Sequence, residues 1–249
     1  MSCVVFSGPT IQPGHARSLF AGATCVGPAA CGDVLRAQMA NATAIVLIDG
    51  YFEHTRPVWH KEILWALTHG VHVYGASSLG ALRAVELEPF GMVGVGRVFE
   101  WFRDGVLEDE DEVTVVHESP ERGYRPISDA LVNIRATMAQ AVGAGVIDPQ
   151  TASALVRSQK ERFYPSRKLA FAVTEMRARG FDVDWDATGR WLECGLVDQK
   201  RADAVEALMR VRDDAAAGFA GLPPPSFEFS YTEAWHEFMR AFGQVRPRF

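Results

Sequence analysis

The sequence predicts an α/β protein with an N-terminal, parallel-sheet, Rossmann-like domain followed by a mostly helical domain. Short apolar runs that are typical of buried strands alternate with helix-like segments in the first half of the chain. After about residue 125 the strand-like runs stop and helical periodicity dominates. We therefore expect an α/β domain over residues 1–125, a helical domain over 126–221, and a Pro-rich linker with an aromatic tail over 222–249.

The composition is that of a soluble globular protein and argues against several classes. The 249 residues are 48% hydrophobic and 22% charged, with a formal net charge of −6. Nucleic-acid-binding proteins need a basic face, so this charge argues against that class. The four cysteines form no metal-ligand spacing, so we expect no metal, no cofactor and a reducing cytoplasm. We recognise no signal peptide and no apolar segment of membrane-spanning length, so no membrane partner is expected.

The first predicted strand covers residues 3–6 and ends in a loop that contains Ser7 and Thr10. Both residues would lie at the carboxyl end of the strand, where open parallel sheets build their binding sites. Thr10 is therefore a candidate binding residue.

The clearest buried strand, residues 44–48, is followed directly by Asp49. A carboxylate at this position can order the turn before Gly50 by accepting local N–H groups. It can also serve a site, by orienting a histidine or by accepting a hydrogen bond from a substrate. The sequence leaves both roles open.

Residues 57–67 predict an amphipathic helix with a proline in its first turn. His60, Lys61 and Glu62 bring three ionisable side chains to the start of this helix. Such a group is most often a solvated helix face. It is also the set of groups that an acid–base site at this end of the sheet would use.

The stretch over residues 72–86 predicts a strand, a tight turn of small residues and a helix. Gly75 and Gly80 allow backbone or a ligand to approach closely. Ser77 and Ser78 lie between them, in a segment that differs from G-x-S-x-G only by alanine at the first glycine.

Three interpretations of this serine pair stay open. One serine can cap the following helix by accepting an N–H of its first turn. One can be a reactive nucleophile, with helix N–H groups directed at the same place. The turn can also bind an anion, because a helix N-terminus attracts phosphate or carboxylate.

The rest of the chain is predicted to be helical. The acidic run over residues 108–112 is expected to be solvated, with a magnesium site or a docking patch as the alternative. The aromatic tail is expected to pack back on the body of the protein, with partner binding as the alternative. Helical segments are predicted at 129–140, 152–163, 168–179 and 198–213.

The chain resembles the TfuA-like protein family. The resemblance covers the sequence from its N-terminus to about residue 140, and the motifs occur in a specific order. They are Gly8–Thr10, Gly32–Asp33, Ile48–Phe52, Val58–Leu64, Gly75–Ala84, Phe90–Gly96, Asp109–Val113 and Ser128–Thr137.

The resemblance implies a role in peptide-backbone thioamidation. TfuA-like proteins act with YcaO enzymes, which activate a peptide amide with ATP and replace its oxygen by sulfur. The implied activity is hydrolysis of the C-terminal thiocarboxylate of a ThiS-like sulfur-carrier protein, which releases sulfide to the YcaO enzyme. The implied partners are the YcaO enzyme, the carrier and, through the YcaO enzyme, a precursor peptide.

Within this resemblance we expect Ser78 to attack the thiocarboxylate, His60 to act as base, and Asp49 to orient His60. The backbone N–H groups of Leu79 and Gly80 would hold the oxyanion. The residues expected to bind or flank the substrate are Ser77, Gly75, Gly80, Lys61, Glu62, Arg83 and Thr10. As an alternative mechanism, Ser78 only binds and His60 or Glu62 activates water directly.

Two other functions stay open. The protein can be a non-catalytic partner that binds and activates a YcaO enzyme or docks its peptide substrate. A nucleotide-binding α/β module is the third reading, and stabilisation by ATP in a thermal melt would reveal it.

Overall fold

The computed structural model describes residues 2–51, 55–220 and 225–242. Contacts between Cα atoms divide the chain into two compact units. Met1–Glu108 together with Arg201–Phe249 form the sheet unit, and Asp109–Lys200 form the helical unit. Each unit is described by itself below.

The sheet unit is built on five parallel strands in the order β2-β1-β3-β4-β5. This order is one of the two common doubly wound arrangements, and it confirms the predicted parallel α/β fold. Phe6 lies opposite Leu47, and Leu47 lies opposite Gly75, so β1, β3 and β4 end at the same edge. The strands are β1 (Cys3–Phe6), β2 (Ala23–Val26), β3 (Ala44–Leu47), β4 (His72–Ala76) and β5 (Val93–Val95).

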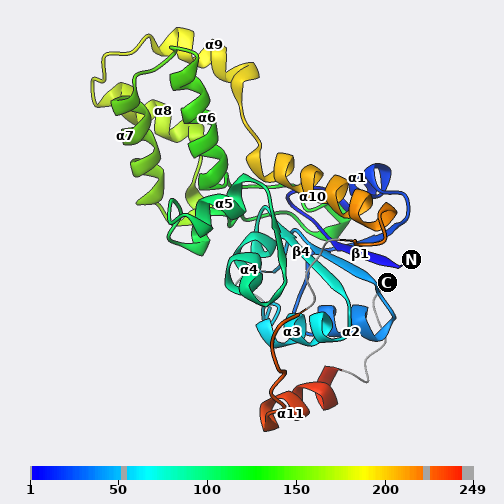
Figure 1. Ribbon diagram of the computed structural model, residues 1–249. Helices are drawn as coiled ribbons and strands as arrows, with labels where there is room; N and C mark the ends of the chain where they lie inside the picture. Colours follow the sequence, from blue (N-terminus) through cyan, green and yellow to red (C-terminus); the bar gives the residue numbers. More distant parts are fainter. Residues whose placement is uncertain (1, 52–54, 221–224, 243–249) are drawn as a thin grey trace. The chain divides into compact units, whose positions relative to one another are not determined.

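Helices cover both faces of this sheet (Figure 1). Helices α1 and α10 pack on one face and α2, α3, α4 and α5 on the other. Strands covered in this way are apolar throughout, and every residue of β1 and β3 is buried. The helices are α1 (Pro13–Leu19), α2 (Asp33–Met39), α3 (His60–Thr68), α4 (Leu79–Leu87), α5 (Arg97–Arg103), α10 (Gln199–Ala216) and α11 (Glu233–Phe242), with a short 3₁₀ turn at Glu88–Phe90.

Helix α10 joins the sheet although it is separated from it by the whole helical unit in sequence. Ala204, Ala207, Leu208 and Val211 form one stripe at helical spacing and are buried against the sheet. The sequence analysis grouped this helix with the helical domain that ended at 221, because helical periodicity alone does not show what a helix packs against.

The described part of the C-terminal segment packs back on the sheet unit, as expected. Trp235 is fully buried, and it forms a cluster with Leu35 of α2 and with Trp59 and Trp65 at α3. The rings of Trp235 and Phe238 are stacked with centroids 5.2 Å apart. The linker residues 221–224 and the end of the chain, 243–249, lie outside the described residues.

The helical unit contains a core of its own between α6, α7, α8 and α9. Asp148 and Asp184 cap two of its helices, because each carboxylate accepts N–H groups of the following first turn. The helices are α6 (Leu131–Gly143), α7 (Pro149–Lys160), α8 (Leu169–Ala178) and α9 (Trp185–Gly195), with 3₁₀ turns at Glu110–Glu112, Pro120–Arg122 and Tyr164–Ser166.

The acidic run is part of this unit from Asp109 onward, and it is solvated as expected only in part: Glu108, Asp109 and Glu110 are exposed, whereas Glu112 is buried. Glu112 is 1% exposed and pairs with Arg135 at 2.7 Å and Lys160 at 3.0 Å. Asp109 pairs with Lys160 at 2.6 Å, and Asp111 pairs with the fully buried Arg167. Asp109, Asp111 and Glu112 are therefore paired with basic side chains of the same unit.

Two further observations concern the described residues only. They contain no group of three or more His, Cys, Asp or Glu side chains placed to hold a metal ion. None of their helices is both long and apolar enough to cross a bilayer.

Candidate functional site

Asp49 lies directly after β3 at the edge where β1, β3 and β4 end, and it is 2% exposed. Its carboxylate accepts the N–H of Gly8 at 2.8 Å and the N–H of Thr10 at 3.0 Å. It also accepts a hydrogen bond from the hydroxyl of Thr10 at 2.6 Å. Hydrogen bonds to a charged acceptor are stronger than neutral ones, so Asp49 fixes the loop after β1 against β3. The structure thus brings together the predicted Asp49 and Thr10, as partners of each other.

The turn between β4 and α4 holds the two serines in an unusual backbone conformation. Ser77 has φ 68°, which residues other than glycine rarely adopt. The N–H of Ser78 donates to the carbonyl oxygen of Ala76 at 2.8 Å, which closes a three-residue γ-turn around Ser77. A γ-turn with a positive central φ is strained, and such strain is concentrated at active sites and ligand-binding loops.

Two glycines let this turn lie close to the sheet. A Cβ atom on Gly80 would lie 1.8 Å from the carbonyl oxygen of Leu47, and one on Gly75 would lie 2.1 Å from the carbonyl oxygen of Gly80. Either contact would force the backbone apart, so helix α4 can start against the ends of β3 and β4 only with glycine at both positions. The N–H of Gly80 donates to the carbonyl oxygen of Ile48 at 3.4 Å. In this state it is therefore engaged with the sheet and does not offer the oxyanion donor that the sequence analysis assigned to it.

The position of Ser78 bears on the capping interpretation. Ser78 occupies the N-cap position of α4, but its hydroxyl does not make the capping hydrogen bond to the first turn. Ser77 is fully buried and Ser78 is 9% exposed. The hydroxyl of Ser78 therefore does not cap α4 in this structure.

His60 is held on the surface by a residue that the sequence analysis missed. Its Nε2 lies 2.7 Å from Oε2 of Glu86, and the same oxygen accepts a hydrogen bond from Arg83 at 2.6 Å. Burial alone would raise the pKa of Glu86, but the hydrogen bond from His60 and the charge of Arg83 outweigh it and lower that pKa. Arg83 also donates through Nε to the carbonyl oxygen of Val58 at 3.1 Å. The spacing of Arg83 and Glu86 on one helix face was the available signal for Glu86.

The expected set of Ser78, His60 and Asp49 is not joined in this structure. Among the described residues, His60 pairs with Glu86, and Asp49 pairs with the loop after β1. Glu86 follows Ser78 by eight residues in α4, which corresponds to roughly 12 Å along the helix axis. Direct transfer of a proton from Ser78 to His60 therefore requires His60 to leave Glu86.

Glu62 has a structural role. It is fully buried, and its two oxygens accept four backbone N–H groups at 2.8 to 3.2 Å, from Trp59, Gly32, Val34 and Leu35. Glu62 thus accepts the N–H of the N-cap residue of α3 and holds the first turn of α2. Burial raises the pKa of Glu62 to about 7, although the backbone hydrogen bonds oppose this rise. Because both oxygens are used, Glu62 is not placed to contact a substrate in this state.

Lys61 faces the C-terminal segment. Its ammonium group donates to the hydroxyl of Thr232 at 2.8 Å and lies 5.3 Å from the ring centroid of Phe229. A groove of about 330 Å³ lies here between α3 and the segment, lined by Trp59, His60, Lys61, Leu64, Phe90, Phe227, Glu228, Phe229 and Ser230. Lys61 and His60 therefore line the same groove beside the C-terminal segment.

Comparison with protein families gave one match. A family model described as TfuA-like protein matches residues 49–168. The matched range includes Asp49, His60 and the serine turn, and it continues through α6 and α7 of the helical unit. Phe52, at the end of one of the expected motifs, lies outside the described residues. No curated protein matches the chain.

Proposed function

Because this chain belongs to the TfuA-like family and so has a role linked to YcaO-dependent thioamidation, we propose that it supplies the sulfur. In this proposal it hydrolyses the C-terminal thiocarboxylate of a ThiS-like sulfur-carrier protein and releases sulfide to a YcaO enzyme. The single observation that carries the proposal is the strained turn at Ser77, which holds two hydroxyls at the start of α4. A reactive site is one of the few reasons for a protein to retain such strain.

The turn suits the end of a carrier protein. A Gly-Gly thiocarboxylate tail is thin, and the turn is made of small residues between Gly75 and Gly80. The tail ends in an anion, which the positive end of the α4 macrodipole attracts. Thr10 and Asp49, at the same sheet edge, form a rigid wall beside which the tail would lie.

The chemistry follows from an acyl group with a sulfur leaving group. The oxygen of Ser78 forms a bond to the thiocarboxylate carbon, the C–S bond breaks, and sulfur leaves as HS⁻ with the serine proton. Water then hydrolyses the acyl ester, which gives the carrier carboxylate and one proton and restores the serine. The net reaction consumes one water for each sulfide released. Ser77, one residue earlier in the turn, binds the tail in this scheme.

His60 remains the base in this proposal, from a second side-chain conformation. Its side chain is 41% exposed, and among the described residues it is held by one hydrogen bond, to Glu86. Leaving an exposed charged partner costs under about 1 kcal/mol, which a bound substrate can offset. Arg83, beside Glu86, and Lys61 are proposed to hold the anionic end of the substrate before attack.

Substitution of each serine in turn tests the proposal. We expect Ser78→Ala to lower sulfide release from a thiocarboxylated carrier by at least about 100-fold, since a nucleophile is lost. Ser77→Ala should weaken carrier binding more than it slows the chemical step. Sulfide release that is unchanged in Ser78→Ala would exclude Ser78 as the nucleophile.

A second candidate function is favoured by one observation. Ser78 and His60 are not joined in this structure, as would be expected of a protein that only docks a carrier or peptide for a YcaO enzyme. A non-catalytic partner would release no sulfide from the carrier when assayed alone. It would still raise thioamidation by the YcaO enzyme when sulfide is supplied.

A further inference from the structure

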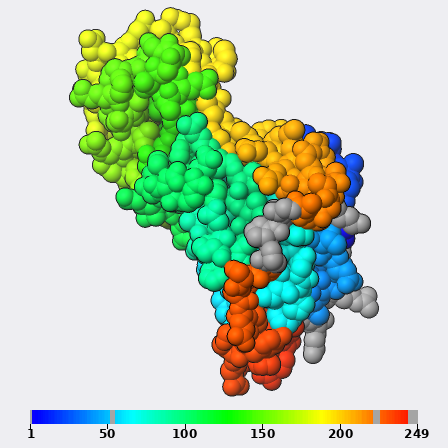
Figure 2. Space-filling view, viewed as in Figure 1, coloured from blue at the N-terminus to red at the C-terminus, as the bar shows by residue number. Residues whose placement is uncertain are grey.

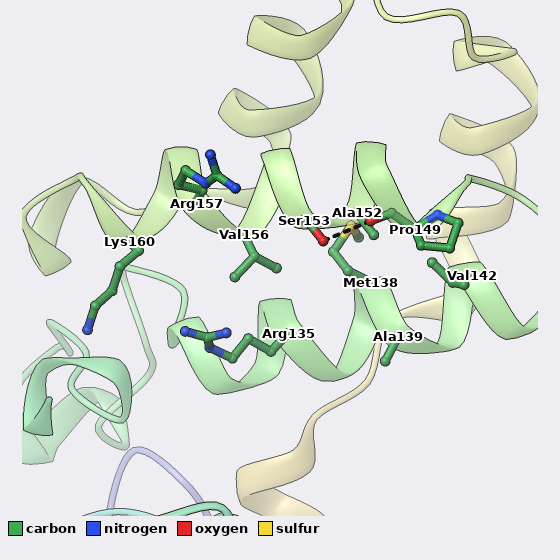
Figure 3. A pocket seen from close by; sticks show the side chains of 10 residues that line it. All are labelled: Arg135, Met138, Ala139, Val142, Pro149, Ala152, Ser153, Val156, Arg157 and Lys160. Atoms are coloured by element: carbon green, nitrogen blue, oxygen red, sulfur yellow. Dashed lines mark hydrogen bonds between the residues drawn. The ribbon is translucent and has the colours of Figure 1, made fainter. Parts of the chain in front are cut away.

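A second, open groove of about 600 Å³ lies within the helical unit, between α6 and α7. Figure 3 shows the two helices side by side, with Val156 of α7 and Met138 of α6 directed into the space between them. The groove is lined by Arg135, Met138, Ala139, Val142, Pro149, Ala152, Ser153, Val156, Arg157 and Lys160. None of these lining residues is acidic.

The two ends of the groove differ in character. Arg135, Arg157 and Lys160 gather at one end, and Val142 and Pro149 lie at the other (Figure 3). The hydroxyl of Ser153 donates a hydrogen bond to the carbonyl oxygen of Pro149 at 2.8 Å. It therefore adds little polarity to the apolar end of the groove. A ligand that fills the groove must therefore be acidic at one end and apolar along the rest.

The three cations are not equally available. Lys160 already pairs with Asp109 and Glu112. Arg135 donates through Nε to Glu112. Arg157 is exposed, and the described residues give it no ion-pair partner. The acidic run therefore holds Arg135 and Lys160 in position from behind, and Arg157 supplies a positive charge that the unit does not itself neutralise.

The floor of the groove is built to stay in place. Met138 and Ala152 are buried and belong to the core of the helical unit. Val156 and Val142 are half-buried at its sides. A groove between two packed helices, with a rigid apolar floor, is the shape in which an amphipathic helix is commonly bound.

We propose that this groove binds an amphipathic helix of a protein partner, with aliphatic side chains on the α6–α7 floor and a carboxylate beside Arg157. Charge complementarity at the basic end selects the occupant. Nucleic acid is disfavoured because a phosphate backbone needs a broad basic face, whereas two of the three cations here are already paired with acidic side chains. The inference does not depend on the serine turn, so either proposal can fail without the other.

The test uses the full chain and a defined probe. The probe is a fluorescein-labelled peptide of roughly 16 residues, long enough to form a helix, with Leu at helical spacing and Glu at most other positions. A matched peptide carries Lys in place of Glu. Binding is followed by fluorescence anisotropy at two salt concentrations, because an electrostatic contact weakens with salt.

We expect the Glu peptide to bind and the Lys peptide to bind at least about tenfold more weakly. Arg157→Glu should weaken the Glu peptide by at least about tenfold, and Ala139→Trp should block the apolar part of the groove. Arg190→Glu is the matched control, because Arg190 is exposed in α9 of the same unit and does not line the groove. It should leave binding within about twofold.

Thermal melts of each variant show whether the helical unit is still folded. Equal binding of the two peptides would overturn the proposal, and so would no saturable binding at about 1 mM. Loss of binding in Arg190→Glu as large as in Arg157→Glu would also overturn it, since it would indicate a diffuse charge effect.

Discussion

The imidazole of His60 lies 2.7 Å from the carboxylate of Glu86, and this pair joins the start of α3 to the last turns of α4. It places the only histidine of the predicted catalytic set on the surface beside Arg83. The proposed activity therefore depends on release of His60 from Glu86.

The first prediction concerns this release. Glu86→Gln removes the charge that holds His60, so we expect sulfide release from the carrier to be retained or raised. The cost in stability should stay under about 1 kcal/mol, because exposed ion pairs contribute little. Steady-state sulfide assays and urea unfolding measure the two effects. A loss of activity as deep as that of Ser78→Ala would instead make Glu86 a group that orients His60 for catalysis.

The stability that the His60–Glu86 pair contributes depends on pH, and the lowered pKa of Glu86 gives the direction of this dependence. The pKa of Glu86 is lowered in the folded protein from its ordinary value of 4.5. The stability that this pair contributes is therefore present above about pH 4.5 and is lost as the pH falls through the lower folded value. The difference in unfolding free energy between the wild type and Glu86→Gln should shrink on acidification, and a difference that grows would contradict the pairing.

Glu62 provides the second prediction, on stability. Glu62→Ala leaves four backbone N–H groups at the starts of α2 and α3 without their acceptor. We expect a loss of about 3 kcal/mol or more, since buried donors without a partner are costly. Chemical denaturation measures it. A loss under about 0.5 kcal/mol would show that these four hydrogen bonds do not hold the two helices.

The raised pKa of Glu62 also predicts how the stability of the folded protein changes with pH. Burial raises its pKa in the folded state to about 7, from an ordinary value of 4.5. A carboxyl group with a raised folded pKa binds its proton more tightly in the folded than in the unfolded chain. Its contribution to stability therefore declines as the pH rises from about 4.5 to about 7, and is constant above. In Glu62→Ala this component should be absent, and an unchanged profile would assign it to another group.

The third prediction tests the close approach of α4 to the sheet. Gly80→Ala would put a methyl group 1.8 Å from the backbone oxygen of Leu47, which has no freedom to move aside. We expect a loss of about 2 kcal/mol or more, together with loss of activity. Gly189→Ala is the control, because nothing lies within 4 Å of that position in α9. It should stabilise the protein by about 0.5–1 kcal/mol. A tolerated Gly80→Ala with full activity would contradict the geometry of the turn.

The fourth prediction concerns the C-terminal segment. Trp235 is fully buried among Leu35, Trp59 and Trp65. We expect Trp235→Ala to cost about 3–5 kcal/mol, as for other large side chains removed from a core. Met209→Ala, at a position of α10 that is 46% exposed, should change stability by less than about 0.5 kcal/mol. Equal effects of the two substitutions would mean that the segment does not contribute to the folded unit.

The sheet could be predicted because buried parallel strands appear in a sequence as short, fully apolar runs. Residues 3–6 and 44–48 read directly as strands, and β1 and β3 lie there. The serine turn was also readable, because glycine and serine at a strand-to-helix junction restrict what the backbone can do. The packing of α10 against the sheet could not be predicted, because the sequence of a helix shows which face is apolar but not which element that face contacts.

The partners of individual polar residues were the hardest to predict. His60 and Glu86 are 26 residues apart, and only the packing of α3 against α4 brings them together. Glu62 looked like part of a solvated helix face, yet its acceptor capacity is used by the start of α2, far earlier in the chain. Position along one helix does not reveal such tertiary hydrogen bonds.

The most direct test of the proposed activity is sulfide release by the purified protein from a thiocarboxylated ThiS-like carrier, with no YcaO enzyme present. We predict multiple turnovers of sulfide and a carrier that ends in carboxylate, with both lost in Ser78→Ala. A carrier that keeps its thiocarboxylate in the presence of folded wild-type protein would contradict hydrolysis and leave a docking partner.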